Sequence, residues 1–210
     1  MEIKLESAGK RFQYDWIFKN LNQTIPEGTA LAITGSNGSG KSTLLKCIAA
    51  LNPLTEGKIT YDFKNRRISD SDIFNYLVIS APYLELPEEF QLLELLAFHF
   101  KFKYPVHGMT FEAMMDRMYL EGHKNKPISQ FSSGMKQRLK LGLCLFSNVP
   151  LVLLDEPTSN LDEKGINWYL ELIGDYAKNK TLLICSNDER EYGFCHHKIH
   201  IEDYKPTQRL

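Results

Sequence analysis

The sequence predicts an α/β fold with a mostly parallel sheet, and three observations support this prediction. Short apolar runs alternate with helix-like segments along the 210 residues, a pattern typical of parallel sheets whose faces are covered by helices. A glycine-rich turn at residues 35–43 joins an apolar run to an amphipathic segment. A later apolar run, residues 151–154, ends in the carboxylates Asp155 and Glu156. Both features would lie at carboxyl ends of strands, where such sheets bind their ligands.

Strands are predicted where apolar residues form short runs or alternate with polar residues. In chain order the predicted strands occupy residues 1–5, 18–25, 30–34, 57–61, 76–80, 151–154, 181–185 and 198–201. Helices are predicted where apolar residues recur at helical spacing. The predicted helices occupy residues 41–51, 88–101, 110–119, 133–146 and 163–178.

The segment at about residues 84–130 interrupts this alternation. It is rich in Leu, Phe and Met and holds two of the predicted helices. A chain of this length buries one substantial core. We therefore expect a single domain of residues 1–210 with an inserted helical lobe at about residues 84–130.

Composition excludes several classes of protein. The net charge is −1, which gives little attraction to nucleic acid, so no nucleic-acid partner is expected. No uncharged apolar run approaches the ~18 residues that cross a bilayer. The N-terminus lacks the basic-then-apolar layout of a signal peptide, and the four cysteines show no disulfide spacing. These features predict a soluble protein that is not exported.

The turn at residues 35–43 reads Gly-Ser-Asn-Gly-Ser-Gly-Lys-Ser-Thr and matches the phosphate-binding pattern G-x-x-x-x-G-K-[ST]. Its glycines let backbone N–H groups converge on an anion, and the following helix adds its positive N-terminal dipole. Lys41 would reach the β and γ phosphates, and Ser42 would bind Mg²⁺. A Gly/Ser loop that binds nothing is the alternative. The residues predicted to bind the nucleoside triphosphate are Gly35, Ser36, Asn37, Gly38, Ser39, Gly40, Lys41, Ser42 and Thr43.

Asp155 and Glu156 stand where a phosphate-loop ATPase needs two carboxylates. Asp155 is suited to hold Mg²⁺ through water, and Glu156 is suited to polarise the attacking water. A strand that merely ends in two acids at a turn is the alternative. Further segments favour the catalytic interpretation: Phe-Ser-Ser-Gly-Met precedes the pair, Ser-Asn-Leu-Asp follows it, and a later apolar strand ends in Ser-Asn-Asp.

In this order and spacing, the motifs resemble those of the ATP-binding subunits of ABC transporters over nearly the whole chain. The resemblance implies the ABC ATPase fold: a P-loop NTPase core with a mostly parallel sheet, an antiparallel β subdomain and an inserted helical subdomain. It implies an enzyme that binds ATP and Mg²⁺, hydrolyses ATP and drives transport through separately encoded integral membrane subunits. Such a protein would be cytoplasmic and attached to the inner face of the membrane through its partner.

The resemblance also implies a dimer, either a homodimer or a pair with a second ATP-binding subunit. The family signature Leu-Ser-Gly-Gly-Gln acts in trans on the γ-phosphate held by the partner. Ser132 and Gly134 match this signature, whereas Ser133 and Met135 depart from it. An ordinary N-cap by Ser132 is the alternative. The family loop that crosses the dimer interface corresponds to Ser159, Asn160, Leu161 and Asp162.

Two nucleotide contacts of the family are assigned by position. An aromatic residue upstream of the phosphate loop stacks on adenine in this family, which implies Phe12, with Tyr14 and Trp16 as alternatives. The family histidine after the last core strand, which touches the γ-phosphate, is Asn187 here. An amide donates a hydrogen bond but carries no positive charge. We therefore expect slow hydrolysis, with Asn187 in the catalytic position.

The helical lobe departs from the family pattern as well. The glutamine that follows the strand at residues 76–80 and links the metal site to the helical lobe is absent near Ala81 and Pro82. Either the coupling differs in this chain or the segment is misregistered. Residues 84–104 hold more apolar side chains than one helical face needs. They form either a docking surface for a short helix of the membrane subunit or the core of the lobe.

Two other functions remain open from the sequence. One is a soluble ABC-type ATPase that acts as a clamp or assembly factor without a membrane partner. The other is a nucleotide-binding regulatory partner with little hydrolysis. Asn187 and Met135 point to the regulatory partner, and the retained Glu156 opposes it.

Overall fold

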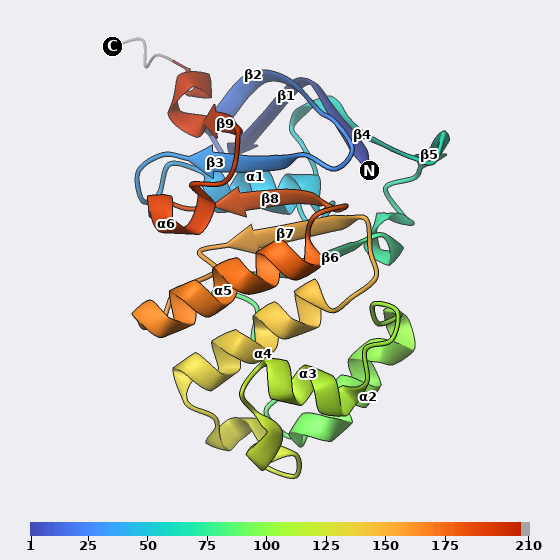
Figure 1. Cartoon of the computed structure of the whole chain (residues 1–210). Coiled ribbons are helices and arrows are strands. Elements are labelled where there is room, and N and C mark those ends of the chain that lie inside the picture. The colour runs from blue at the N-terminus through green and yellow to red at the C-terminus, as the bar shows by residue number, and fades with distance from the viewer. Residues whose placement is uncertain (207–210) are drawn as a thin grey trace.

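The computed structural model describes residues 1–206, which form two sheets and a set of helices (Figure 1). The predicted α/β class is confirmed. A five-stranded parallel sheet has the strand order β6-β7-β8-β3-β9, and a four-stranded antiparallel sheet has the order β2-β1-β4-β5. The strands span Glu2–Phe12 (β1), Asp15–Ile25 (β2), Ala30–Thr34 (β3), Glu56–Phe63 (β4), Arg66–Ile68 (β5), Leu77–Ser80 (β6), Leu151–Asp155 (β7), Thr181–Cys185 (β8) and His197–His200 (β9).

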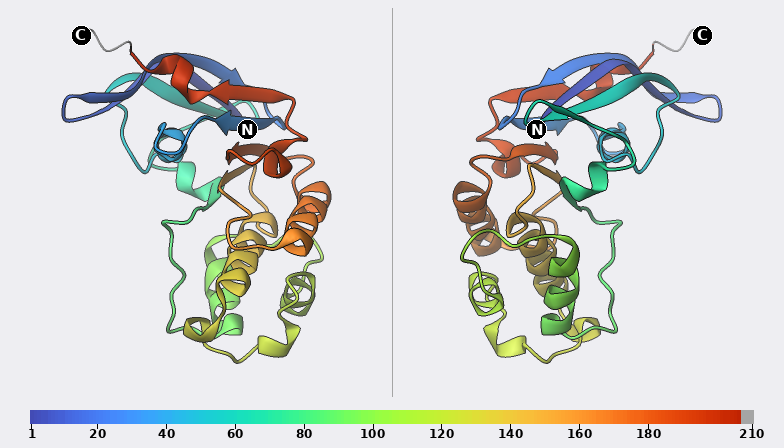
Figure 2. Two further views of the ribbon diagram at one scale, coloured as in Figure 1. Left: turned by 90° about the vertical axis from the view of Figure 1, so that its left-hand side faces the viewer. Right: turned by 90° about the vertical axis from the view of Figure 1, so that its right-hand side faces the viewer.

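The helices gather mainly at one end of the molecule. They span Lys41–Ile48 (α1), Leu92–Phe102 (α2), Phe111–Arg117 (α3), Ser133–Leu145 (α4), Glu163–Tyr176 (α5) and Glu189–Tyr192 (α6). The antiparallel sheet and the lobe of α2 and α3 lie at opposite ends, with the parallel sheet between them (Figure 2). None of the helices within residues 1–206 is long and apolar enough to span a membrane.

The parallel sheet is covered on both faces, as the continuous apolar runs predict. Every side chain of β7 and β8 is buried. Val152 and Leu154 belong to a core shared with α2 to α5, whereas Leu151 and Leu153 belong to a second core shared with α1 and the antiparallel sheet. Successive side chains of a strand point to opposite faces. One strand therefore ties the two cores together.

The N-terminal hairpin is longer than the sequence pattern predicts. The pattern indicates strands at residues 1–5 and 18–25, whereas β1 continues to Phe12 and β2 begins at Asp15. Register shifts between Leu5 and Ala8, and again up to Arg11, interrupt the pairing of β1 with β2. These irregularities break the alternation of apolar and polar residues on which strand prediction depends.

The helices of the lobe begin slightly later than predicted. α2 begins at Leu92, and the Gln91 N–H donates to the Glu94 carboxylate at 2.9 Å. α3 begins after Thr110, whose hydroxyl accepts a hydrogen bond from the Ala113 N–H at 3.2 Å. Both contacts satisfy N–H groups that have no partner in the first turn of a helix. Hydrogen bonds at their N-termini therefore set where these two helices begin, which the spacing of apolar residues does not determine.

A buried lysine joins α4 to the parallel sheet. Lys180 lies directly before β8 and is 9% exposed. Its Nζ donates to the carbonyl oxygens of Leu145 and Ser147, each at 2.8 Å. Carbonyls at the end of a helix have no partner within the helix, so this contact satisfies them. Burial lowers the pKa of Lys180 to about 8, because it disfavours the charged form.

We predict that Lys180 makes stability depend on pH. Between pH 8 and 10.5 the folded lysine is largely neutral while the unfolded one still holds its proton, so its contribution to the free energy of unfolding rises with pH. Lys180→Met removes this contribution. Urea titrations give the free energy of unfolding of the parent and of Lys180→Met at each pH. The difference, parent minus variant, should grow by on the order of 2–3 kcal/mol between pH 8 and 10.5. Exposed Lys178→Met is the control. A difference that does not change with pH would contradict the prediction.

Candidate functional site

Most of the predicted phosphate-binding residues, those at positions 37–43, line one pocket, whereas Gly35 and Ser36 lie outside its lining. The loop between β3 and α1 borders a cavity of about 210 Å³. The cavity is lined by Ile17, Asn37, Gly38, Ser39, Gly40, Lys41, Ser42, Thr43 and Glu156. The Lys41 side chain is 5% exposed, and its Nζ donates to the carbonyl oxygens of Gly35 at 2.8 Å and Ser36 at 3.1 Å. The loop thus curls around the ammonium group.

Two glycines permit this curvature. Gly40 has φ +113°, and a Cβ there would lie 2.3 Å from Cγ2 of Ile17. Gly35 has φ +143°, and a Cβ there would lie 2.8 Å from the Ser39 hydroxyl oxygen. Such φ values favour glycine. Any other residue at these positions would strain the backbone and crowd the space in which backbone N–H groups converge on an anion.

Asp155 ends β7 in a setting that suits a cation. It is 2% exposed, and neither of its carboxylate oxygens has a hydrogen-bond partner within residues 1–206. Burial raises the pKa of Asp155, while the neighbouring Ser42 hydroxyl and the Lys41 ammonium act in the opposite direction. An unpaired buried carboxylate is costly. A carboxylate beside a hydroxyl is a donor set that fits Mg²⁺, a hard cation that prefers oxygen ligands.

Glu156 reaches the same pocket through an unusual backbone conformation. Its φ is +45°, which is uncommon for a residue other than glycine. The Glu156 N–H donates to the Cys185 carbonyl at 2.9 Å, and its own carbonyl accepts from the Ser159 N–H at 3.1 Å. These bonds hold the turn in place, so the side chain lines the pocket instead of continuing the strand. Left-handed residues of this kind cluster at functional sites.

Asn187 also comes to the phosphate loop. It follows β8, and its side-chain amide donates to the amide oxygen of Asn37 at 2.8 Å. The structure therefore brings Lys41, Asp155, Glu156 and Asn187 to one edge of the parallel sheet. Each of them follows or ends a strand or opens the helix after one.

The signature residues lie elsewhere in the same chain. Ser132 caps α4, and its hydroxyl accepts from the Met135 N–H at 3.3 Å. A Cβ on Gly134 would lie 3.4 Å from the Asn160 carbonyl oxygen. Ser132, Ser133, Gly134 and Met135 are not among the residues that line the phosphate-loop pocket. A single chain therefore does not bring the signature to its own pocket.

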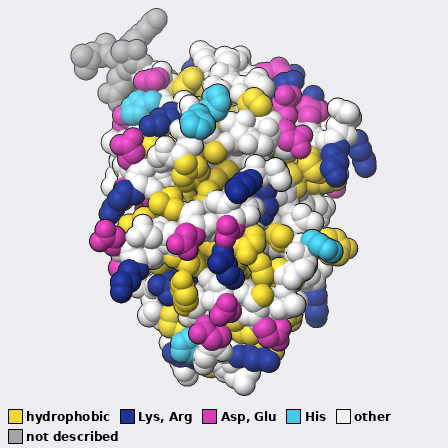
Figure 3. Space-filling view, in the orientation of Figure 1, with side chains coloured by type: hydrophobic (Ala, Val, Ile, Leu, Met, Phe, Trp, Pro, Cys, Tyr) yellow, Lys and Arg dark blue, Asp and Glu magenta, His cyan; other side chains and the backbone are white. Residues whose placement is uncertain are grey.

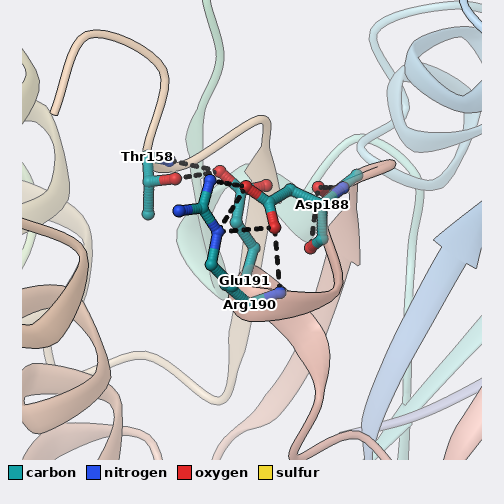
Figure 4. Close-up of polar contacts among 5 residues, drawn as sticks. Thr158, Asp188, Arg190 and Glu191 are labelled. Carbon is teal, nitrogen blue, oxygen red and sulfur yellow. Dashed lines mark hydrogen bonds and ion pairs between the residues drawn. The ribbon is translucent and has the colours of Figure 1, made fainter. Parts of the chain in front are cut away.

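A buried acid ties Thr158, the residue before the predicted interface loop, to α6 (Figure 4). Glu191 is 3% exposed, and its Oε1 accepts from the Thr158 N–H at 2.7 Å and from the Thr158 hydroxyl at 2.5 Å. The Tyr169 hydroxyl donates to the Glu191 carbonyl at 2.9 Å. The next segment holds the predicted interface residues Ser159, Asn160, Leu161 and Asp162. Asp162 caps α5 by accepting from the Gly165 N–H at 2.8 Å.

The aromatic residue predicted to stack on adenine is not among the residues that line the pocket. Phe12 is 48% exposed at the end of β1, with Lys10 Nζ 4.8 Å from its ring centroid. The adenine contact of Phe12 stays a prediction. Ile17 of β2 contacts the phosphate loop instead, at Gly40.

Sequence patterns missed three residues around the site. Ile17 is one of several apolar residues in β2, and Glu191 is one of four successive charged residues, so neither stands out. Glu202 lies close to the C-terminus, and its Oε1 accepts from both the N–H and the hydroxyl of Ser36. The contacts of Glu191 and Glu202 join residues that lie 33 and 166 positions apart in the sequence. Pairs so far apart produce no periodic pattern from which they could be predicted.

The chain is similar in sequence to known proteins. Residues 18–159 match a family model described as ABC transporter. The lantibiotic transport ATP-binding protein SrtF of Streptococcus pyogenes is 28% identical over 186 residues, which cover 88% of this chain and 80% of that protein. The cytochrome c biogenesis ATP-binding export protein CcmA of Reclinomonas americana is 33% identical over 177 residues, covering 81% and 77%.

Solved structures share the fold. A dimeric, post-hydrolysis state of the ATP-binding cassette MJ0796 bound to ADP and Pi has a TM-score of 0.82 at 26% identity and covers 96% of this chain and 94% of its own. A putative ABC transporter ATP-binding protein from Pyrococcus furiosus has a TM-score of 0.81 at 19% identity and covers 98% and 100%. At that identity the likeness concerns the fold alone.

We predict that the carboxylate of Glu191 stabilises the loop around Thr158. Glu191→Ala leaves a buried N–H and a hydroxyl without their acceptor, so the free energy of unfolding should fall by about 1–3 kcal/mol. Glu191→Gln retains an acceptor oxygen and should lose less. Urea denaturation measures both, with the exposed Glu189→Ala on the same helix as control. Equal losses in all three variants would rule out the buried contact as the cause.

Proposed function

Because this chain belongs to the ABC transporter family of ATP-binding proteins, we propose that it hydrolyses ATP as half of a dimer and drives transport through separate membrane subunits. The observation that carries the proposal is the pocket in which Lys41, Ser42 and Glu156 converge beside the unpaired carboxylate of Asp155. Lys41 to Thr43 would bind the phosphates together with Gly35 to Gly40. This arrangement suits phosphoryl transfer, in which positioning and charge stabilisation do most of the work.

The proposed reaction is the transfer of the γ-phosphoryl group of ATP to water, giving ADP and phosphate. Lys41 and the N-terminus of α1 hold the phosphates, and Ser42 with Asp155 would hold Mg²⁺. The bound metal would neutralise charge on the β and γ phosphates. Glu156 accepts a hydrogen bond from the attacking water and orients it. Asn187, whose amide lies against Asn37 of the loop, would donate a hydrogen bond to the γ-phosphate.

A dimer is proposed because one chain supplies an incomplete site. Ser132 and the first N–H groups of α4 form an anion site at a helix N-terminus, yet they do not line the pocket of their own chain. A second subunit arranged head to tail would bring its signature to that pocket. The partner is a second copy or another ATP-binding subunit. The dimeric MJ0796 cassette is a related assembly.

A groove beside the helical lobe is the proposed contact with the membrane subunit. It has a volume of about 470 Å³ and is lined mainly by apolar side chains from β6, α2 and α4 and from the segment after β6. Phe74 and Phe102 of this groove are 62% and 68% exposed. A short amphipathic helix fits such a groove. The names of SrtF and CcmA, a lantibiotic transport and a cytochrome c biogenesis export protein, support a transport system, and that of CcmA favours export.

We predict that Glu156→Gln binds ATP but hydrolyses it on the order of 100-fold more slowly, because the amide no longer attracts the proton of the attacking water. ATPase assays and equilibrium binding of a fluorescent ATP analogue measure the two properties. The exposed Glu171→Gln on α5 is the control and should retain parental turnover. Full activity of Glu156→Gln would remove Glu156 from this role.

The same variant tests the partner. Tagged Glu156→Gln protein is purified from detergent-solubilised native cells with ATP, and bound proteins are identified by mass spectrometry. A stoichiometric polytopic membrane protein, lost when Phe102→Asp is added, supports the transporter function. Recovery of soluble assembly factors alone would favour an ABC-type ATPase without a membrane partner, a function that no feature of residues 1–206 specifically favours.

Asn187 provides a separate prediction about rate. Asn187→His introduces a group that can carry positive charge near the γ-phosphate, so turnover should rise by roughly tenfold with little change in KM. Asn187→Ala should lower turnover, since the amide donor is lost. Steady-state ATPase kinetics measure all three proteins. If the histidine variant is as slow as the parent, the amide is not what limits hydrolysis.

A further inference from the structure

The segment that follows β9 lies against the start of the phosphate loop. β9 pairs in parallel with β3 (Figure 1), and His200 stands opposite Thr34, the residue directly before the loop. The 3₁₀ helix η4, Ile201–Tyr204, comes next. Ile201 is fully buried, and a Cβ on Gly35 would lie 2.9 Å from its Cγ2. The first residue of the loop therefore packs directly on η4.

Glu202 of η4 binds the second residue of the loop. Its Oε1 accepts from the Ser36 N–H at 3.3 Å and also from the Ser36 hydroxyl. Its Oε2 lies 3.0 Å from Nε2 of His200, whose Nδ1 lies 3.3 Å from the Thr34 hydroxyl oxygen. A carboxylate only accepts, so the contact with His200 requires a proton on Nε2. The hydrogen bonds from Ser36 lower the pKa of Glu202, because they favour its charged form.

Ser36 in turn holds the lysine of the phosphate site. Lys41 Nζ donates to the carbonyl oxygens of Gly35 and Ser36. Glu202 therefore binds the N–H of the same residue whose carbonyl accepts from the ammonium group. Neither Ser36 nor Glu202 lines the phosphate-loop pocket. The carboxylate thus supports the loop from outside and leaves the space for the phosphates free.

We propose that Glu202 is a positioning residue that holds Ser36, and through it the start of the phosphate loop, in the shape that receives the phosphates. This inference rests on the proposed ATPase function. A loop that is ordered only when nucleotide binds loses conformational freedom at that moment, whereas a loop held in advance avoids this cost. The charge of Glu202 acts in the opposite direction, because it repels phosphate groups. Its acceptor oxygens, not its charge, therefore carry the role.

Nucleotide affinity and turnover, measured together on the full chain, test this role. Glu202→Ala should weaken equilibrium binding of a fluorescent ATP analogue with Mg²⁺ about three- to tenfold. The KM for ATP should rise by the same factor while kcat stays within about twofold of the parent, because the groups that act on the γ-phosphate are unchanged. Glu202→Gln keeps an acceptor oxygen without the charge and should retain parental affinity. Asp203→Ala removes an exposed carboxylate from the same helix and should behave as the parent.

A double-mutant cycle tests whether Ser36 is the partner. Ser36→Ala removes the hydroxyl but keeps the N–H bond, so it should weaken binding less than Glu202→Ala. Glu202→Ala should then cost less affinity in the Ser36→Ala background than in the parent. A fraction of unfolded protein would lower kcat and leave KM unchanged, which separates positioning from a folding defect.

Three results would overturn the role of Glu202: a parental or lower KM in Glu202→Ala, an equal loss of affinity in Glu202→Gln, or losses that simply add in the cycle with Ser36→Ala. If the parent itself does not bind the ATP analogue, the proposed function fails instead.

Discussion

A carboxylate held out of water at the end of a fully buried strand is the constraint that organises this molecule. Asp155 lacks a hydrogen-bond partner within residues 1–206, and an uncompensated buried charge is costly. Its surroundings reduce that cost. The Lys41 ammonium and the Ser42 hydroxyl lie nearby, and Lys46 adds a second positive charge. The Cys185 thiol contacts the Lys41 carbonyl at 3.4 Å, which fixes the start of α1 against β8. The packing of α1 against the sheet therefore also places the positive charges that offset the buried carboxylate.

Parallel strands explain why so many groups meet at this edge. The chain leaves β3 into the phosphate loop, β6 into Tyr83, β7 into Glu156 and β8 into Asn187. All these strands run in the same direction, so the segments that follow them emerge on the same side. On the face seen in Figure 3, acidic and basic side chains are interspersed with apolar ones, so charge on that face is not concentrated at one place. The common direction of the strands brings the groups of the site to one edge of the sheet.

The turn after β7 is connected to two other elements. Its Thr158 bonds the buried Glu191 of α6, and the Gln137 amide of α4 donates to the Pro157 carbonyl at 2.5 Å. A change at Glu156 is therefore adjacent to the helix that follows Asn187 and to the helix that begins at the signature. The same α4 reaches Ala81 through Lys140. Such contacts give a physical route by which one proposed nucleotide site could influence both the dimer partner and the groove.

The amino-acid sequence by itself determined the α/β class, the order of the core elements, the glycine-rich turn at residues 35–43 and the two carboxylates at the end of β7, because these depend on local periodicity and on short contiguous patterns. Such patterns do not predict which residues Phe12, Ile17 and Tyr83 contact in the folded chain. Whether Phe12 or Ile17 lines the pocket depends on how the β1–β2 hairpin, with its irregular register, lies over the loop. The contact between Lys46 and Tyr83, and the burial of Glu191 among exposed charged neighbours, exist only once distant segments pack together. Tertiary structure alone decided these, since the free energy of burying a side chain depends on the neighbours that folding assembles around it.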